Sequence, residues 1–222
     1  MSKKSGGSIR KAALSLPILV ALLAAYTARP ADTDQTGAQI VAQGTKNGAI
    51  ACARCHGFDG AAEGSGAFPR ITGQPADYLA DQLRAYASGY RKNSIMQPIA
   101  MGLDDAEIKA VAQYYATARA MPFIPPPQPP ELIARGREIA KSGDANAHVD
   151  ACETCHGSNG EGIPPIPYLA GQYSQYTKLQ FRMYREGFRK TDLMGDPAKN
   201  LKEADVAAVA AYFEQLSRAA AK

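Results

Sequence analysis

The sequence predicts an all-α protein made of two tandem copies of one small domain. The first observation is a repeat: the segment that begins at Gly73 aligns without gaps with the segment that begins at Gly171, at an offset of 98 residues. Self-similarity of this kind indicates a duplicated structural unit. The second observation is that apolar residues near the end of each copy recur at three- and four-residue steps, whereas no alternating strand pattern is visible.

Residues 1–28 predict a signal peptide or an N-terminal anchor. A short basic stretch precedes an almost unbroken apolar run from Ala12 to Ala25, and this run is short for a membrane span. No clean cleavage motif follows, so the alternative to a cleaved signal peptide is an uncleaved segment that associates with the membrane. The folded part is expected outside the cytoplasm, in the periplasm, either soluble or anchored by its N-terminus.

The charge of the chain argues against nucleic acid as a partner. The whole sequence has a formal net charge of +4, but the first 28 residues hold four basic and no acidic side chains. The rest therefore balances 21 basic against 21 acidic residues. A balanced surface lacks the cationic patch that phosphate backbones require.

The repeat divides the remaining chain into a first domain at 33–120, a proline-rich linker at 121–130 and a second domain at 131–222. The linker holds six prolines in ten residues, which cannot continue a helix and which favour an extended, semi-rigid segment. A proline-recognition motif is the alternative reading of this segment.

Each copy is expected to contain the same elements in the same order. A helix with a Gly-x-x-Ile element comes first, at Gly37 to Ile40 and at Gly136 to Ile139. A cysteine-rich string, a glycine-rich loop, a helix from about Tyr78 or Tyr176, and a terminal helix follow. The apolar faces of the two terminal helices, which we expect to pack in a core, are Ile108, Val111, Tyr114 and Tyr115, and Val206, Val209, Tyr212 and Phe213.

All four cysteines and two of the three histidines lie in two copies of one string, CARCH at Cys52 to His56 and CETCH at Cys152 to His156. This string is the attachment motif of a c-type haem. Two thiols at this spacing each add to one vinyl group, and the adjacent histidine reaches the iron from the same face. The expected thioether anchors are Cys52, Cys55, Cys152 and Cys155, and the expected proximal ligands are His56 and His156.

Other uses of a Cys-x-x-Cys pair fit less well. A zinc ribbon needs its two pairs about 15 to 20 residues apart, and Cys55 and Cys152 are much farther apart than that. A thioredoxin-like dithiol needs surrounding βαβ strands, and none are visible. A disulfide would leave the two adjacent histidines unexplained. We therefore expect two covalently bound haem c groups.

The repeat also selects candidates for the opposite side of each iron. Only Met96 and Met194, of six methionines, occupy matched positions, and both lie in segments expected to be loops. A thioether can ligate haem iron, and a His and Met pair raises the reduction potential. The alternative is that both methionines fill gaps in an apolar core. The remaining histidine, His148, is expected to be an exposed loop residue.

Two further sets of matched residues have competing interpretations. Pro69 and Pro167 precede the aligned segments, and their carbonyls either accept a hydrogen bond from the ligating histidine or belong to residues that merely shape the loop. Matched Arg-Lys pairs precede the two methionines. They either serve haem propionates or acidic partners, or form a solvated helix end; they are Arg91 and Lys92, and Arg189 and Lys190.

These motifs resemble the tandem dihaem class I cytochromes c, most closely the cytochrome c4-like group. The resemblance rests on the haem strings, the segments PRITGQ and PYLAGQ, the helices YLADQL and YTKLQF with their GYRK or GFRK ends, the two methionines and the closing helices. It covers nearly everything after residue 33. It implies two class I cytochrome c folds related by a pseudo-twofold axis, with His and Met ligands at both irons, and it supports the role of the two proline carbonyls. The first loop after the haem string is two residues longer, which departs from strict duplication.

The resemblance implies a periplasmic electron-transfer protein rather than an enzyme. Its partners would be redox proteins such as a quinol-oxidising complex, a dehydrogenase or a terminal oxidase. One alternative is a cytochrome subunit of a membrane-bound dehydrogenase or oxidase complex. The other is a dihaem peroxidase or a thiosulfate-oxidising enzyme, which would need an open iron or an unusual ligand. The sequence offers no spare cysteine for that role.

Overall fold

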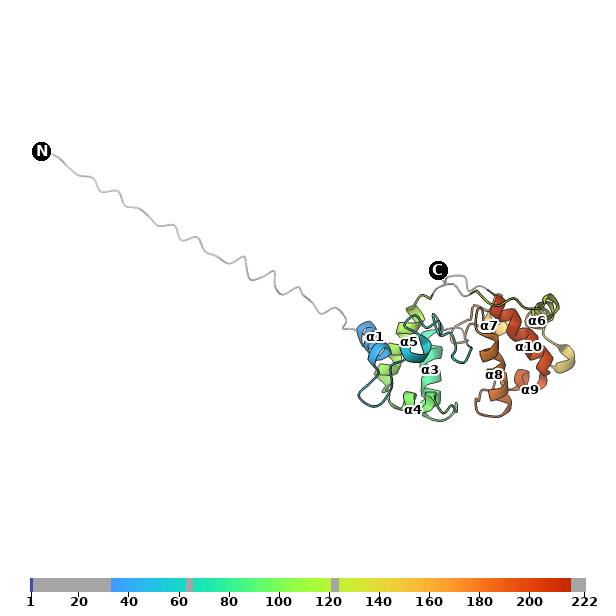
Figure 1. Ribbon diagram of the computed structural model, residues 1–222, viewed down its shortest axis with the longest axis horizontal. Helices are drawn as coiled ribbons and strands as arrows, with labels where there is room; N and C mark the ends of the chain where they lie inside the picture. The colour runs from blue at the N-terminus through green and yellow to red at the C-terminus, as the bar shows by residue number, and fades with distance from the viewer. Residues whose placement is uncertain (2–32, 63–65, 121–123, 217–222) are drawn as a thin grey trace. The chain divides into compact units, whose positions relative to one another are not determined.

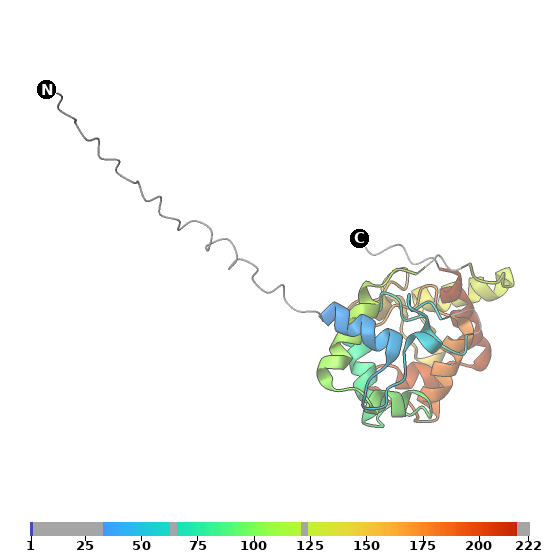
Figure 2. The same ribbon diagram turned by 60° about the vertical axis from the view of Figure 1, so that its left-hand side comes forward.

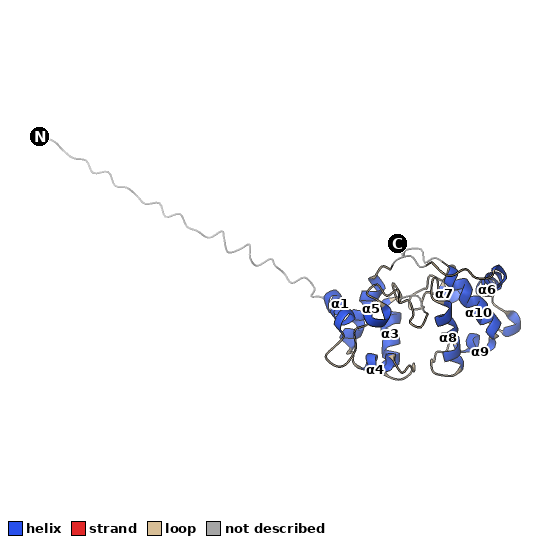
Figure 3. Ribbon diagram, in the orientation of Figure 1, coloured by secondary structure: helices blue, strands red, loops and turns tan. Residues whose placement is uncertain are grey.

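The structure is a computed structural model that describes residues 1, 33–62, 66–120 and 124–216. The predicted signal or anchor at 1–28 lies outside the described residues, except for Met1. The described residues form helices and two isolated bridges, with no strand (Figure 3), so the all-α prediction is confirmed. None of the helices in the described part of the chain is long and apolar enough to cross a membrane.

The same order of helices occurs twice along the chain (Figure 1). The first unit contains α1 (Thr33–Gln43), α2 (Ala53–His56), α3 (Ala76–Ala87), α4 (Met96–Met101) and α5 (Asp105–Thr117). The second unit contains α6 (Pro130–Ser142), a short 3₁₀ helix η1 (Ala145–Ala147), α7 (Glu153–His156), α8 (Ser174–Arg185), α9 (Gly195–Asn200) and α10 (Glu203–Gln215). Helix α6 starts at the last proline of the expected linker, where proline is tolerated because the first helical N–H needs no partner.

The first and last helices of each unit pack against each other, α1 on α5 and α6 on α10 (Figures 1 and 2). A glycine permits each close approach. A Cβ atom built on Gly37 would lie 2.5 Å from the carbonyl oxygen of Ala110, and one built on Gly136 would lie 2.0 Å from the carbonyl oxygen of Ala208. The Gly-x-x-Ile element therefore marks the crossing point, and its isoleucine is buried in both units.

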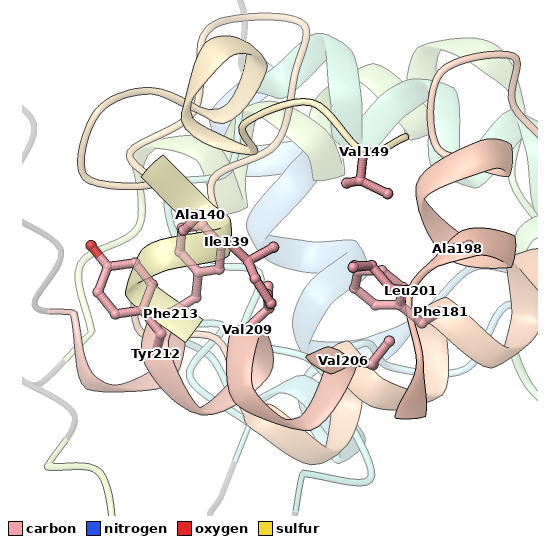
Figure 4. Close-up of a cluster of buried hydrophobic side chains, with 10 residues drawn as sticks. All are labelled: Ile139, Ala140, Val149, Phe181, Ala198, Leu201, Val206, Val209, Tyr212 and Phe213. Atoms are coloured by element: carbon pink, nitrogen blue, oxygen red, sulfur yellow. The ribbon is translucent and has the colours of Figure 1, made fainter. Parts of the chain in front are cut away.

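Each unit has its own apolar cluster, and the expected faces of the terminal helices lie in them. In the second unit the cluster joins α6, α8, α9 and α10 (Figure 4). All eight expected residues are buried except Tyr114, which is half-buried and packs against the cluster edge. Its hydroxyl instead donates a hydrogen bond to the carbonyl oxygen of Phe58, at 2.9 Å.

The two methionine segments are helical, contrary to the expectation of loops. Helix α4 begins at Met96, and α9 begins directly after Met194. In the first unit the side chain of Asn93 accepts hydrogen bonds from the backbone N–H groups of Ile95 and Met96, which starts the turn. Each helix also carries a proline within its first turn, where proline is tolerated. The six-residue helices pack on α3 and α8 respectively.

Candidate functional site

Each cysteine-rich string forms a single helical turn, α2 or α7, that ends at its histidine. The following glycine stops the turn because it adopts a left-handed backbone, with φ of 73° at Gly57 and 86° at Gly157. The turn brings both cysteines and the histidine of a string onto a short, rigid segment. His56 and His156 are buried, with 7% and 8% of their surface exposed.

A proline carbonyl orients each histidine. The Nδ1 atom of His56 lies 3.2 Å from the carbonyl oxygen of Pro69, and the Nδ1 atom of His156 lies 2.8 Å from that of Pro167. The proline carbonyls therefore make the contact that sequence analysis offered as one of two interpretations. If Nδ1 donates to the carbonyl, Nε2 carries the lone pair that a metal ion requires.

Burial also favours the form of these histidines that can bind a metal. Desolvation lowers the pKa of His56 and of His156, and the hydrogen bond to the proline carbonyl only partly opposes this effect. The imidazoles are therefore held neutral, and neutral imidazole is the ligating form.

The environment of the first cysteine of each string does not favour a reactive thiolate. Burial raises the pKa of Cys52 and of Cys152 to about 11. A redox dithiol instead needs a lowered pKa that gives a reactive thiolate. Among the described residues, no group of three or more His, Cys, Asp or Glu side chains is arranged to hold a metal ion.

The histidines and the matched methionines line one cavity of about 900 Å³ that extends into both units. This volume is near the upper end of the range for sites that hold cofactors. Apolar side chains line the cavity, and three of those that belong to the cluster in Figure 4 are Val149, Phe181 and Leu201. A large, flat apolar group with a central metal fits this lining, and it would complete cores that are small for units of this length.

The structure separates the two matched methionines from Met101 and Met183, the other methionines of the described helical part. Met96 and Met194 line the cavity, whereas Met101 is 66% exposed and, like the half-buried Met183, does not line it. His148 is exposed, as expected, and its backbone is left-handed, but its side chain belongs to the cavity rim. Each unit thus places one histidine and one methionine of matched position at the cavity, and the second unit adds His148 at the rim.

Reciprocal glutamine contacts join the two units across their shared cavity. The side-chain amide of Gln74 donates to the carbonyl of Tyr168 and accepts from its N–H, each at 3.1 Å. The amide of Gln172 makes the same pair of bonds with the backbone of Arg70, at 2.8 and 3.0 Å. The matching geometry of the two pairs supports the expected twofold relation between the units.

The interpretation of the Arg-Lys pairs as a solvated helix end is wrong for the two arginines. Arg91 and Arg189 are buried, with 4% and 8% of their surface exposed, whereas Lys92 and Lys190 are exposed. The arginines are buried because the two units pack on each other here: the backbones of Arg91 and Arg189 form an isolated antiparallel bridge.

Sequence reasoning missed four residues that hold these arginines. Each guanidinium contacts both units through glutamine amide oxygens and a tyrosine hydroxyl, at 2.7 to 3.1 Å. The partners are Gln82, Gln180, Tyr78 and Tyr176. They were visible as matched positions of the repeat, but a matched polar residue does not by itself reveal which surface becomes buried.

Comparison with known proteins gives two successive matches along the chain. The family model described as "Cytochrome c" matches residues 35–118 and again 133–217. The chain is 39% identical over 214 residues to the "Thiosulfate dehydrogenase electron acceptor" of Stutzerimonas stutzeri (strain A1501), covering 90% of this chain and 93% of that protein.

Two solved structures are similar. Cytochrome c4 of Acidithiobacillus ferrooxidans has 34% identity and a TM-score of 0.66, over 74% of this chain and 98% of that one. The thiosulfate dehydrogenase (TsdBA) of Marichromatium purpuratum has 34% identity and a TM-score of 0.75, over 84% of this chain. This chain spans 41% of the length of that protein.

Proposed function

The chain belongs to the cytochrome c family, as a tandem, cytochrome c4-like member with two covalently attached haem c groups, and on this premise we propose that it carries electrons from a dehydrogenase to a terminal acceptor outside the cytoplasm. The observation that carries the proposal is the matched pair of one histidine and one methionine at the cavity in each unit. Two saturated irons are suited to electron transfer and leave no position for a substrate.

The proposal assigns a role to each predicted residue. Cys52, Cys55, Cys152 and Cys155 anchor the haems, His56 and His156 are the proximal ligands, and Met96 and Met194 are the ligands on the opposite side. The carbonyls of Pro69 and Pro167 hold the histidine rings in orientation. The domain limits that we propose are 33–120 and 131–222, joined by the linker at 121–130.

The residues of the chain set the conditions for electron transfer. When bound, each haem supplies an iron that exchanges one electron. The proline carbonyls increase the electron density of the histidine ligands, which favours the oxidised state. The methionine thioethers act in the opposite direction, because they are weak donors that favour the reduced state. The apolar lining restricts water near the site and thereby favours the state with less charge.

The electron donor that we propose is a thiosulfate dehydrogenase. The relative from Stutzerimonas stutzeri is named as the electron acceptor of such an enzyme and aligns over 93% of its own length. The similar part of the thiosulfate dehydrogenase from Marichromatium purpuratum supports the same pairing. We further propose that residues 1–28 direct the chain to the periplasm, where such a partner would meet it.

Stopped-flow mixing of the holoprotein with a thiosulfate dehydrogenase and thiosulfate tests this proposal. The absorption bands of both haems should change to those of the reduced state, and the rate should depend on the concentration of the dehydrogenase. Omission of the dehydrogenase is the control. The oxidised holoprotein should then stay oxidised in thiosulfate, because the chain itself performs no substrate chemistry.

Two outcomes would contradict the proposal. Reduction by thiosulfate alone would favour the alternative of a thiosulfate-oxidising enzyme. No reduction in the complete mixture, by an enzyme that reduces another c-type cytochrome in parallel, would exclude this donor.

A further inference from the structure

The cluster of Arg91 and Arg189 is a buried cationic centre shared by both units. The Nη2 atom of Arg91 donates to Tyr176 and Gln180 of the second unit, at 2.8 and 2.7 Å. The Nη2 atom of Arg189 donates to Tyr78 and Gln82 of the first unit, at 2.9 and 3.1 Å. Each guanidinium also bonds a glutamine of its own unit through Nη1 and stacks on a tyrosine ring of its own unit.

Neither guanidinium has a negatively charged partner among the residues that the structure describes. Their hydrogen-bond acceptors are neutral amides and phenols, whereas Arg84 and Arg135 contact aspartates at 2.6 and 2.8 Å. Burial of a cation without an anion is costly, and two cations that share the same acceptors also repel each other. The protein therefore supplies the hydrogen bonds of this centre but not its counter-charge.

The field of the two guanidiniums is strong enough to affect a neighbouring tyrosine. Burial alone would raise the pKa of the Tyr78 hydroxyl, but Arg189 and Arg91 outweigh burial and lower it. An anion at this place would be stabilised in the same way.

The position of the centre indicates which anion completes it. Arg91, Arg189 and their four partners all line the cavity that His56 and His156 also line. A haem bound there brings carboxylate groups, and guanidinium groups bind carboxylates with strong, charge-assisted hydrogen bonds. Because both arginines bond to residues of the two units, neither belongs to one haem site alone.

We propose that Arg91 and Arg189 form one shared cationic centre that binds carboxylate groups of both haems. A change at this centre therefore shifts both reduction potentials in the same direction. The inference rests on the proposed function only in placing a haem in each unit. A nearby cation disfavours the more positive, oxidised iron. The centre thus raises both potentials, and loss of either arginine lowers both.

Spectroelectrochemical titration of the holoprotein tests this inference, with the two haems distinguished by their NMR methyl resonances. In Arg91→Gln and in Arg189→Gln, both potentials should fall. We expect about a tenfold change in each equilibrium constant for reduction, which is about 59 mV for a one-electron couple. The matched control is Lys92→Gln, which removes an adjacent but exposed charge that does not line the cavity and should leave both potentials nearly unchanged.

Two further variants keep the test decisive if removal of an arginine prevents folding. Gln82→Glu places a carboxylate between the two guanidiniums, since Gln82 accepts from both, and should lower both potentials. Arg91→Lys keeps the charge and should leave both potentials close to those of the unchanged protein.

Three results would overturn the inference: a shift confined to the haem of the substituted unit, no shift in any variant, or an equal shift in the Lys92→Gln control. These titrations need no dehydrogenase. If the dehydrogenase did not reduce the protein, the titrations could still be interpreted. If the two potentials did not shift together, the dehydrogenase assay would be unaffected.

Discussion

The two units share one plan but differ in the charge around the haem string. Ala53 and Arg54 of the first unit correspond to Glu153 and Thr154 of the second. Glu153 is mostly buried, with 14% of its side chain exposed; it lies 3.7 Å from Lys141 and accepts a hydrogen bond from Tyr212 at 3.4 Å. The first string thus carries an exposed positive charge, and the second carries a mostly buried negative charge one position earlier.

A second difference lies on the opposite side of the cavity and in the histidine contact. Asp192 and Asp196 line the cavity near Met194, whereas the corresponding residues of the first unit are Ser94 and Pro98. The His156 contact with its proline carbonyl is also shorter than that of His56. Negative charge and a more electron-rich imidazole both favour oxidised iron. The comparison teaches that duplication preserved the residues that we propose as ligands while their surroundings diverged, and it predicts a lower potential in the second unit.

Removal of a methionine ligand should have the largest effect on this comparison. Met96→Ala and Met194→Ala should each abolish the methionine-to-iron absorption band of one oxidised haem and lower the potential of that haem. The fall should be on the order of 0.1 V, within the range of about 0.8 V that axial ligands control. Absorption spectra and redox titration measure both effects.

The matched controls are Met101→Ala and Met183→Ala, which change methionines that do not line the cavity. Their spectra should be those of the unchanged protein. If Met96→Ala and Met194→Ala also retained both bands, the ligand assignment would be wrong.

Substitution of the glycines at the two helix crossings should have the next largest effect, and the loss of stability should differ between the units. Gly136→Ala puts a methyl group closer to a backbone carbonyl than Gly37→Ala does, at 2.0 against 2.5 Å. Overpacking of this kind costs about 1–3 kcal/mol, and the second unit should lose more stability. Denaturant unfolding of the holoproteins, followed by circular dichroism, measures the difference.

Gly195→Ala is the control for that series, since an added Cβ there would meet no atom within 4 Å. It should unfold at nearly the same denaturant concentration as the unchanged protein. Equal stability of Gly136→Ala and this control would show that the α6 and α10 crossing tolerates a side chain, against the close packing described above.

The smallest predicted effect comes from the buried carboxylate of the second unit. Glu153→Gln removes its charge and should raise the potential of the second haem only, by less than the 59 mV that corresponds to a tenfold change in the equilibrium constant. The gap between the two potentials should narrow. A Glu138→Gln control removes an exposed carboxylate of the same unit and should leave the gap between the potentials unchanged. An equal change of the gap in both variants would show that Glu153 does not specifically lower the potential of the second haem.

The repeat made the fold and most of the candidate site predictable. Helical periodicity indicated the terminal helices, and the position in the repeat that Met96 and Met194 share separated them from the other methionines. These features are local or are duplicated, so they leave a direct pattern in the sequence. The short helices at the methionines were missed because six residues are too few to show a helical periodicity. In the first unit the turn starts where the side chain of Asn93 accepts a hydrogen bond from the N–H of Met96.

The cationic centre could not be predicted in the same way. An arginine next to a lysine at a helix end is usually solvated, and its burial depends on how the two units pack. The repeat showed Arg91 and Arg189 as equivalent positions but could not show that these positions meet. Contacts between copies of a duplicated unit leave no periodicity along the chain.

The central claim is that two equivalent ligand sets are tuned differently by their surroundings, and a redox titration of the unmodified holoprotein tests it most directly. We predict two separate one-electron steps, with the haem of the first unit reduced at the higher potential and that of the second unit at the lower one, as assigned by NMR of the partly reduced protein. A single potential shared by both haems, or the reverse order, would contradict the account.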